Sequence, residues 1–192
     1  MEKSFGKKNT AVFISGRGSN LRSLIKYSKT KKSLIRIVLV ISDNSRARGL
    51  IYAKKNKINN IFIKYSNRRS FENRLLHLLK RNKVDLICLA GFMKILSGNF
   101  IKKFYKPILN IHPSLLPKYK GLNTHNRAIE NKEKYSGATV HIVNEKLDSG
   151  KIILQKKIKI LKSDSGKSLQ KKVLKIEHAI YPKAIVRLLT SY

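Results

Sequence analysis

Two polar side chains, Asn110 and His112, stand two residues apart in the short apolar stretch Leu109–Pro117 (LNIHPSLLP). Residues two apart in a β-strand point to the same face, so the amide and the imidazole are predicted to project together while their apolar neighbours are buried. Pro113 favours an extended backbone at His112 and so restricts where the ring points. An amide that donates hydrogen bonds and an imidazole that carries a proton can act on one substrate. A structural histidine near a turn is the alternative.

A second candidate for chemistry is the turn Gly16–Asn20 (GRGSN), which lies between the apolar run Thr10–Ser15 and a predicted helix, Leu21–Ser28. Strand, glycine turn and helix form the layout of a mononucleotide-binding unit, in which the backbone and the helix N-terminus approach a phosphate. The turn lacks the third glycine of a dinucleotide fingerprint and the ending of a P-loop. A tight turn capped by Ser19 or Asn20 is the alternative.

The loop Gly91–Leu96 (GFMKIL) follows a continuous apolar run, Val84–Ala90, that suits the centre of a sheet. Open α/β sheets bind ligands at the carboxyl ends of their strands. An apolar loop at that edge can hold a flat heterocycle through backbone hydrogen bonds. Packing onto the next helix explains the same pattern.

Strands and helices must position these segments. The rest of the chain alternates between apolar runs and amphipathic stretches. The alternation predicts an α/β fold with a doubly wound, mostly parallel central sheet, formed by one domain over residues 1–192. Further strands are predicted at 34–42, 61–64 and 136–144, and helices at 46–57, 70–82 and 124–131. Residues 152–160 predict an antiparallel C-terminal strand, and the segment from Gly166 predicts a long helix kinked at Pro182.

The composition is strongly basic, with 43 Lys and Arg against 10 Asp and Glu in 192 residues, a formal net charge of +33. The basic residues are scattered and accompany many Ile and Asn residues, so we interpret the charge as base composition expressed on a solvated surface. A nucleic-acid-binding module is the alternative, and it would bind with a steep salt dependence. With a single cysteine and no apolar run near the ~20 residues of a membrane span, a soluble, cytoplasmic protein is expected.

Several motifs resemble, in register over nearly the whole chain, those of the phosphoribosylglycinamide formyltransferases, a folate-dependent family of purine synthesis. The Asn-x-His-Pro-Ser segment is shared by several formyl-tetrahydrofolate enzymes, whereas the continuation KYxGLxTH and the ending EHAIYP are more particular to this family. The matching segments are GxGSN from Gly16, LAGFMKILS from Leu89, LNIHPSLLPKYxGL from Leu109, GATVH from Gly137, LDSG from Leu147 and EHAIYP from Glu177.

The resemblance implies an enzyme that transfers the formyl group of 10-formyltetrahydrofolate to the amine of phosphoribosylglycinamide (GAR). The products are formyl-GAR and tetrahydrofolate, in the biosynthesis of IMP. The folate is then a co-substrate and no metal is expected. The expected partners are these two small molecules, with no specific nucleic acid and no membrane, and the expected state is a monomer or weak homodimer.

Asn110, His112 and Asp148 are the catalytic residues that the resemblance implies. Formyl transfer passes through a tetrahedral intermediate, which needs an oxyanion donor and a proton carrier. Asn110 can supply the donor, and His112 can protonate the departing folate nitrogen or stabilise the oxyanion. A carboxylate beside His112 is expected to orient the ring and raise its pKa. By pattern alone, Asp148 before Ser-Gly is typical of a turn.

The resemblance also implies two sets of binding residues. Arg69 is an alternative to Arg68, and a plain charged loop is an alternative for both. The GAR-binding residues implied are Gly18, Ser19, Asn20, Leu174, Lys175, Ile176 and Glu177. The formyl-folate-binding residues implied are Arg68, Met93, Lys94, Ile95, Leu96, Asn110, Asn144, Glu145, Lys146, Leu147 and Asp148.

Departures from the family pattern concentrate around Asp148. Lys151 stands where a proline is expected, Ser149 replaces a usual glycine, and Lys146 could compete with His112 for the carboxylate. The chain also stops at Tyr192, without a C-terminal extension seen in relatives. Methionyl-tRNA formyltransferase and formyltetrahydrofolate hydrolase resemble the core too, but each carries a further domain, so the length of this chain favours the GAR enzyme.

Overall fold

The computed structural model describes residues 6–191 of the chain. It divides into two compact units, Met1–Leu109 and Asn110–Tyr192. The division falls inside the strand β5, Ile108–His112. Each unit is described by itself.

Four parallel strands form the first unit, in the order β3-β2-β1-β4. They are β1 (Lys8–Ile14), β2 (Ile35–Ser42), β3 (Asn60–Phe62) and β4 (Leu86–Leu89). The helices between them are α1 (Ser19–Ser28), α2 (Arg48–Lys55) and α3 (Arg68–Arg81), and α4 (Gly98–Phe104) follows β4. The expected parallel, doubly wound arrangement is therefore confirmed.

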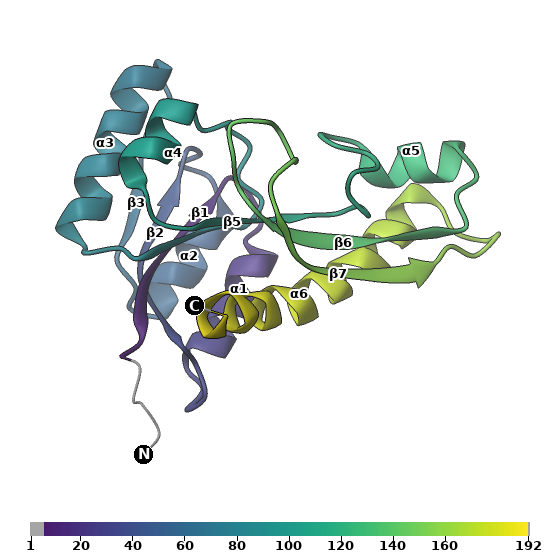
Figure 1. Ribbon diagram of the computed structural model, residues 1–192, viewed down its shortest axis with the longest axis horizontal. Coiled ribbons are helices and arrows are strands. Elements are labelled where there is room, and N and C mark those ends of the chain that lie inside the picture. The colour runs from purple at the N-terminus through teal and green to yellow at the C-terminus, as the bar shows by residue number, and fades with distance from the viewer. Residues whose placement is uncertain (1–5, 192) are drawn as a thin grey trace. The chain divides into compact units, whose positions relative to one another are not determined.

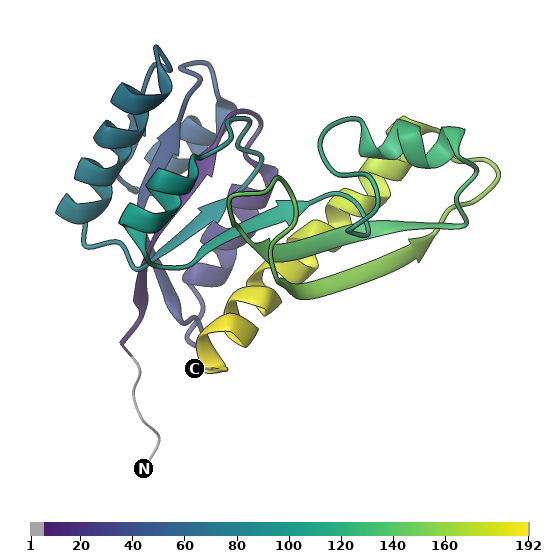
Figure 2. The ribbon, with the colours of Figure 1, turned by 45° about the horizontal axis from the view of Figure 1, so that its top comes forward.

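The order of the strands explains where the helices lie. The chain steps outward from β1 through β2 to β3, and then returns past β1 to β4. Right-handed crossovers in opposite directions place helices on opposite faces of a sheet. Accordingly, α3 and α4 lie side by side on one face, while α1 and α2 cover the other (Figures 1 and 2). The reversal between β1 and β4 creates a switch point, and ligands of doubly wound sheets bind at such points.

The core of the first unit is built from strands buried on both faces, which explains why β1, β2 and β4 read as continuous apolar runs. Helices supply the remaining apolar side chains, such as Leu21 and Leu24 of α1 and Leu75 of α3. Apolar strand residues with no exposed surface include Ala11, Val12, Phe13, Ile14, Ile35, Leu39, Val40, Ile41, Leu86, Ile87 and Cys88.

In the second unit, β6 (Tyr135–Ile142) pairs antiparallel with β7 (Ile152–Lys159), as predicted. The helix α6 (Gly166–Thr190) packs along both strands and against the short helix α5 (Thr124–Glu130), which Figure 2 shows beside the start of α6. A capping box at Ser165 and Ser168 fixes where α6 begins. Pro182 lies inside α6, and the helix continues beyond it to Thr190.

One local prediction in the first unit is wrong. The helix after the glycine turn is predicted to begin at Leu21, and a cap by Ser19 or Asn20 is the alternative to a phosphate site, but α1 already begins at Ser19. Its N-cap is Gly18, which adopts the left-handed conformation (φ 74°) and leaves the helix without a side-chain cap. A glycine adopts this conformation without steric cost, so the chain enters the helix two residues earlier than predicted.

Within residues 6–191, no helix combines the length and the apolar composition that crossing a membrane requires.

Candidate active site

Strand β5 carries Asn110 and His112 to the same carboxylate, as the spacing predicted. Asn110 Nδ2 donates to Asp148 Oδ1 over 3.4 Å, and His112 Nδ1 lies 3.4 Å from Asp148 Oδ2. The side chains of His112 and Asp148 are only 7% and 6% exposed. The three predicted catalytic residues therefore form one cluster within the second unit, in which His112 and Asp148 are buried and Asn110 is half-buried. The expected turn position of Asp148 and its contact with His112 are both observed.

The turn after β6 fixes Asp148 in place. Asp148 itself has a left-handed backbone (φ 46°), which is uncommon for a residue other than glycine and concentrates at functional sites. Gly150 lies so close to β6 that an added Cβ would stand 1.7 Å from the Ile142 carbonyl oxygen. The Ile142 amide donates to the Lys151 carbonyl over 2.9 Å and closes the turn. The departures at 149 and 151 thus leave a closed turn, in which Ser149 Oγ donates to the Leu147 carbonyl.

Lys146 does not compete for the carboxylate. Its amide donates to Asn144 Oδ1, and among the described residues its ammonium group forms no ion pair with Asp148. The exposed segment Asn144–Leu147 bends its charged side chains into solvent, where Leu147 is also 49% exposed. Asp148 is therefore available to the two histidines beside it.

The segment Lys118–Gly121 touches both His112 and Asp148 through its backbone. His112 Nε2 donates to the Tyr119 carbonyl oxygen over 2.9 Å, because a carbonyl only accepts. The Gly121 amide donates to Asp148 Oδ2 over 2.9 Å. A hydrogen on Nε2 fixes the neutral tautomer of His112 and leaves Nδ1, on the side of Asp148, as the nitrogen that takes up or releases a proton.

Burial decides the net pKa of His112: Asp148 raises this pKa as expected, but the effect of burial is larger. Desolvation of the ring lowers the pKa of His112 below its usual value, and the Tyr119 carbonyl and the Asp148 carboxylate oppose this only in part. For Asp148, burial alone would raise the pKa, but the contact with His141, the hydrogen bond from the Gly121 amide and the charge that His112 carries when protonated lower it overall. Asp148 is thus ionised and His112 largely neutral near pH 7.

His141 is a member of the cluster that the sequence did not assign a role. Its Nδ1 donates to the Ile142 carbonyl over 2.9 Å, so Nε2 faces Asn110 Nδ2 at 3.3 Å and Asp148 Oδ1 at 3.6 Å. The predicted strand 136–144 contains His141, but the strand pattern alone does not reveal that this side chain lies beside Asp148. The signal in the sequence that could have identified it was a histidine in an otherwise apolar run.

In the first unit, the glycine turn has the geometry of an anion site. Gly18 packs against α2 so closely that an added Cβ would stand 2.6 Å from Gly49 Cα. The Gly49 amide donates to the Gly16 carbonyl over 3.2 Å and holds the turn open at the N-terminus of α1. The first turn of α1 has no acidic residue and no side-chain cap, so its N–H groups and the positive end of its dipole suit a phosphate. The predicted Ser19 and Asn20 form this first turn.

The loop Gly91–Leu96 is clamped at both ends. At its start, the Met93 amide donates to Ser15 Oγ over 2.9 Å, and Ser15 Oγ donates to Asp43 Oδ1 over 2.5 Å. After its end, Glu72 accepts hydrogen bonds from the Ser97 amide and hydroxyl, at 2.7 and 2.6 Å. The backbone of the loop is therefore held at both ends.

Two apolar side chains of this loop point to solvent. Met93 and Ile95 are 61% and 56% exposed, whereas Leu96 is buried. Exposed large apolar groups on a backbone fixed at both ends suit a flat ligand better than they suit packing onto α4. Lys94 lies between them, with its ammonium 3.9 Å from Asp43 Oδ2 and over the ring of Tyr65.

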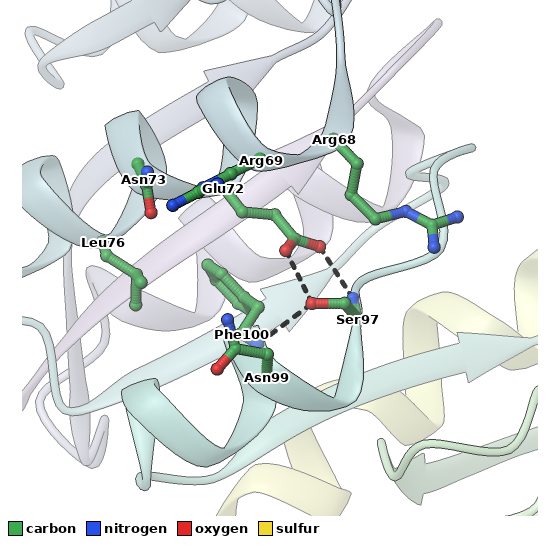
Figure 3. A pocket seen from close by; sticks show the side chains of 8 residues that line it. All are labelled: Arg68, Arg69, Glu72, Asn73, Leu76, Ser97, Asn99 and Phe100. Carbon is green, nitrogen blue, oxygen red and sulfur yellow. Dashed lines mark hydrogen bonds between the residues drawn. The ribbon is translucent and has the colours of Figure 1, made fainter.

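Arg68 and Arg69 begin α3 and border a pocket of about 240 Å³ between α3 and the start of α4. Figure 3 shows the Glu72 carboxylate turned toward Ser97, while the guanidinium of Arg68 extends outward. The residues that line the pocket are Arg68, Arg69, Glu72, Asn73, Leu76, Ser97, Asn99 and Phe100.

The predicted residues on α6 divide by exposure. Lys175 is exposed and Leu174 is half-buried, whereas Ile176 and Glu177 are 7% and 8% exposed. Ile176 belongs to the apolar face of the helix, so its predicted contact with a substrate has no support from its position. Over residues 6–191, no group of three or more His, Cys, Asp or Glu side chains is arranged to hold a metal ion.

Comparison with known proteins identifies relatives of this chain. The formyl transferase family model matches residues 8–185. The chain is 43% identical over 181 residues to phosphoribosylglycinamide formyltransferase of Haemophilus influenzae, covering 93% of this chain and 85% of that one. It is 42% identical to the bovine trifunctional purine biosynthetic protein adenosine-3, covering 93% of this chain but only 18% of the length of that relative.

Solved structures agree with these relatives. The phosphoribosylglycinamide formyltransferase of Brucella melitensis superimposes with a TM-score of 0.89 at 41% identity, covering 93% of this chain and 94% of that one. The enzyme of the same name from Bacillus halodurans gives a TM-score of 0.91 at 31% identity, covering 95% of each chain.

Proposed function

The chain belongs to the formyl transferase family and, within it, to the phosphoribosylglycinamide formyltransferases, and we propose on this basis that it formylates GAR. The formyl donor is 10-formyltetrahydrofolate, and the products are formyl-GAR and tetrahydrofolate, as in the biosynthesis of IMP. The observation that carries the proposal is the cluster of Asn110, His112 and Asp148, assembled from a strand end and the turn after β6.

The cluster has a group for each demand of the reaction. The amine nitrogen of GAR attacks the formyl carbon, the carbonyl oxygen becomes an oxyanion, and the bond from that carbon to N10 of the folate then breaks. Asn110 Nδ2 donates to the oxyanion. The amine loses one proton and N10 gains one. His112 is neutral with its Nε2 hydrogen bonded to Tyr119, so Nδ1 can accept the first proton and return the second.

Asp148 stabilises the imidazolium that exists between these two proton transfers. It is ionised, buried and within 3.4 Å of Nδ1, so its charge acts with little screening by water. His141 lies on the other carboxylate oxygen and holds Asp148 from that side. The carboxylate is thus oriented before any substrate arrives.

Each substrate has a candidate set of residues. For GAR, the N–H groups at Gly18, Ser19 and Asn20 receive the phosphate, and Glu177 with Leu174 and Lys175 meets the ribose and glycinamide portion. For the folate, the candidates are the backbone of Met93–Leu96 in the first unit, which is assigned to the pterin, and Asn144–Asp148 in the second unit. Arg68, or Arg69 beside it, pairs with the negatively charged end of the folate.

The reaction as proposed uses two small molecules and no metal, in the cytoplasm, by a monomer or weak homodimer. The charge of +33 attracts both anionic substrates without forming a specific nucleic-acid site. Treatment with EDTA followed by desalting is therefore expected to leave the rate of formyl transfer unchanged.

The choice of acceptor tests the proposal. The purified chain is supplied with 10-formyltetrahydrofolate and with either GAR or methionyl-tRNA, and each formylated product is measured. We expect formyl-GAR and no formylmethionyl-tRNA. Formylation of the tRNA-bound methionine alone would overturn the assignment.

A further inference from the structure

We propose that Tyr119 and Glu133 are positioning residues, which hold the Tyr119 carbonyl against His112 Nε2 and so keep Nδ1 as the proton-carrying nitrogen. The inference rests on the proposed function and assigns a role to residues outside the predicted site. Neither side chain reaches the catalytic cluster itself. Both act through the backbone of the segment Lys118–Gly121.

The segment is complementary to the His112 and Asp148 pair. Its carbonyl at Tyr119 accepts from the ring, and its amide at Gly121 donates to the carboxylate, each over 2.9 Å. The ring N–H of His112 therefore meets an acceptor, and the carboxylate of Asp148 meets a donor. A small rotation of this backbone would lose both hydrogen bonds together.

The backbone conformation of the segment needs support from elsewhere. Tyr119 adopts φ 56°, a left-handed conformation that is unfavourable for a bulky residue. Such conformations persist when the surroundings hold them. A tyrosine in this conformation would relax if its side chain were released, and the carbonyl would turn with it.

Glu133 supplies the support from the loop after α5. Tyr119 Oη donates to Glu133 Oε1 over 2.9 Å, and Lys118 Nζ donates to the same oxygen over 2.7 Å. The pKa of Glu133 is lowered by these two hydrogen bonds, so the carboxylate is ionised. One carboxylate thus ties down two consecutive residues of the segment.

Arg127 of α5 holds the segment from its other side. Its guanidinium lies over the Tyr119 ring, 5.1 Å from the centroid, and donates to the Lys120 and Leu122 carbonyls at 2.8 and 3.3 Å. The aromatic ring is therefore fixed by a hydrogen bond at its hydroxyl and a cation at its face. Loss of the hydroxyl bond leaves the stacking in place, so the fold is expected to survive.

Several charged or titratable groups influence His112 besides the Tyr119 carbonyl. Asp148 raises its pKa, whereas His141 and Arg127 lower it, and the pKa of His125 is in turn lowered by burial and by His112. A variant that only removes the tyrosine hydroxyl changes none of these charges. Tyr119→Phe is therefore the most direct test.

The experiment measures the His112 ring by NMR on the full chain labelled with ¹⁵N-histidine, across pH, with His112→Gln to assign its signals among the five histidines. In the parent, neutral His112 should carry its hydrogen on Nε2. In Tyr119→Phe and Glu133→Ala, we expect a mixture of both tautomers. The pKa should fall by about 0.5 pH unit, since a hydrogen bond favouring the charged form is weakened.

Matched variants distinguish a positioning role of Tyr119 and Glu133 from an effect of charge or of stability. Glu133→Gln keeps an oxygen that accepts from Tyr119 and is expected to restore the parent tautomer. Glu130→Gln removes a negative charge from exposed α5 and should leave both tautomer and rate unchanged. In Tyr119→Phe, kcat should fall about tenfold with an unchanged KM for GAR, because a misplaced proton carrier affects the transition state.

A parent-like tautomer and pKa in both Tyr119→Phe and Glu133→Ala would overturn the proposal. So would a fall in kcat without any change in the His112 signals, because that result indicates a purely structural role. The NMR readout does not depend on the reaction. A parent that carries the expected tautomer but forms no formyl-GAR would contradict the proposed function and leave this inference standing.

Discussion

His112 combines a buried ring with two different partners, an acceptor-only carbonyl at Nε2 and a carboxylate at Nδ1. In the proposed reaction, this environment lets a single histidine exchange protons with an amine and with N10 of the folate. Because burial lowers its pKa, the ring is neutral when the amine attacks. The proton that it then gains is stabilised by Asp148 only while the intermediate exists.

The lowered pKa of His112 also predicts how stability depends on pH. In the unfolded chain this histidine takes up a proton near pH 6.5, whereas in the folded chain burial delays that uptake to lower pH. The unfolded state therefore binds more protons just below pH 6.5, and stability falls as the pH drops through that window. Burial has the same effect on His125.

Thermal unfolding between pH 7.5 and about 5, a window set by the ordinary pKa of histidine, should therefore show a falling melting temperature. His112→Gln is expected to flatten this slope, and His77→Gln, which replaces an exposed histidine, serves as the control. A His112→Gln slope equal to that of the parent would contradict the buried, neutral ring.

Ser15 links the loop Gly91–Leu96 to the end of β1, and it predicts a selective effect on folate. Ser15→Ala removes the acceptor for the Met93 amide together with the bond to Asp43. The KM for 10-formyltetrahydrofolate should rise about fivefold, the effect of losing roughly one hydrogen bond, while kcat changes little. Steady-state kinetics with each substrate varied in turn measure both values.

Ser28→Ala provides the control for Ser15→Ala, since Ser28 Oγ bonds only within its own helix, to the Ile25 carbonyl. Its kinetic constants should match those of the parent. An equal rise of KM for GAR and for the folate in Ser15→Ala would indicate general loosening of the unit instead of a displaced folate loop.

At the scale of elements, the turn before α1 depends on close approach of two glycines. Gly18→Ala would place a Cβ 2.6 Å from Gly49 Cα at a position with φ 74°, so both sterics and backbone oppose it. We expect a loss of about 1–3 kcal/mol in unfolding free energy, typical of a side chain forced into a left-handed position, and weaker binding of GAR. Chemical denaturation and calorimetric titration with GAR measure the two effects.

Gly16→Ala is the matched control in the same turn, because an added Cβ there meets nothing within 4 Å. Its stability should equal that of the parent. If Gly18→Ala bound GAR as tightly as Gly16→Ala, the turn would not be the phosphate site.

Also at this scale, the elements themselves were largely predictable from the sequence. The buried strands of the first unit read as continuous apolar runs, and α3 and α6 showed helical spacing, so their places were found to within a few residues. The start of α1 was not predicted correctly. Its N-cap is Gly18, a left-handed glycine packed on Gly49, and this contact joins residues that are distant in the sequence. Pro182, where a kink is predicted, lies inside α6, and the helix continues to Thr190.

For the whole molecule, the sequence predicted which residue types would do the chemistry but not the groups that set their protonation. Asn110, His112 and Asp148 were found from spacing and resemblance, and the structure brings them together. The Tyr119 carbonyl and the Gly121 amide have no signature in sequence, because every residue has a backbone. The sequence predicted that Asp148 raises the pKa of His112 but missed the larger, opposite effect of burial, since the depth of burial emerges only when the chain is folded.

At the scale of the whole molecule, the net charge does not explain selectivity for one substrate. A net charge of +33 spread over the surface creates a long-range attraction for anions but no shape that selects one. Selectivity for GAR is therefore assigned to the cluster and the glycine turn. The central claim is that the cluster catalyses formyl transfer to GAR.

The most direct test measures formyl-GAR produced from 10-formyltetrahydrofolate and GAR by the parent and by Asp148→Asn, side by side. The parent should turn over, and Asp148→Asn should lose about 10²- to 10⁴-fold in kcat, the usual contribution of a proton-transfer group, with the melting temperature little changed. No formyl-GAR from the parent, or a parental rate from Asp148→Asn, would contradict the account.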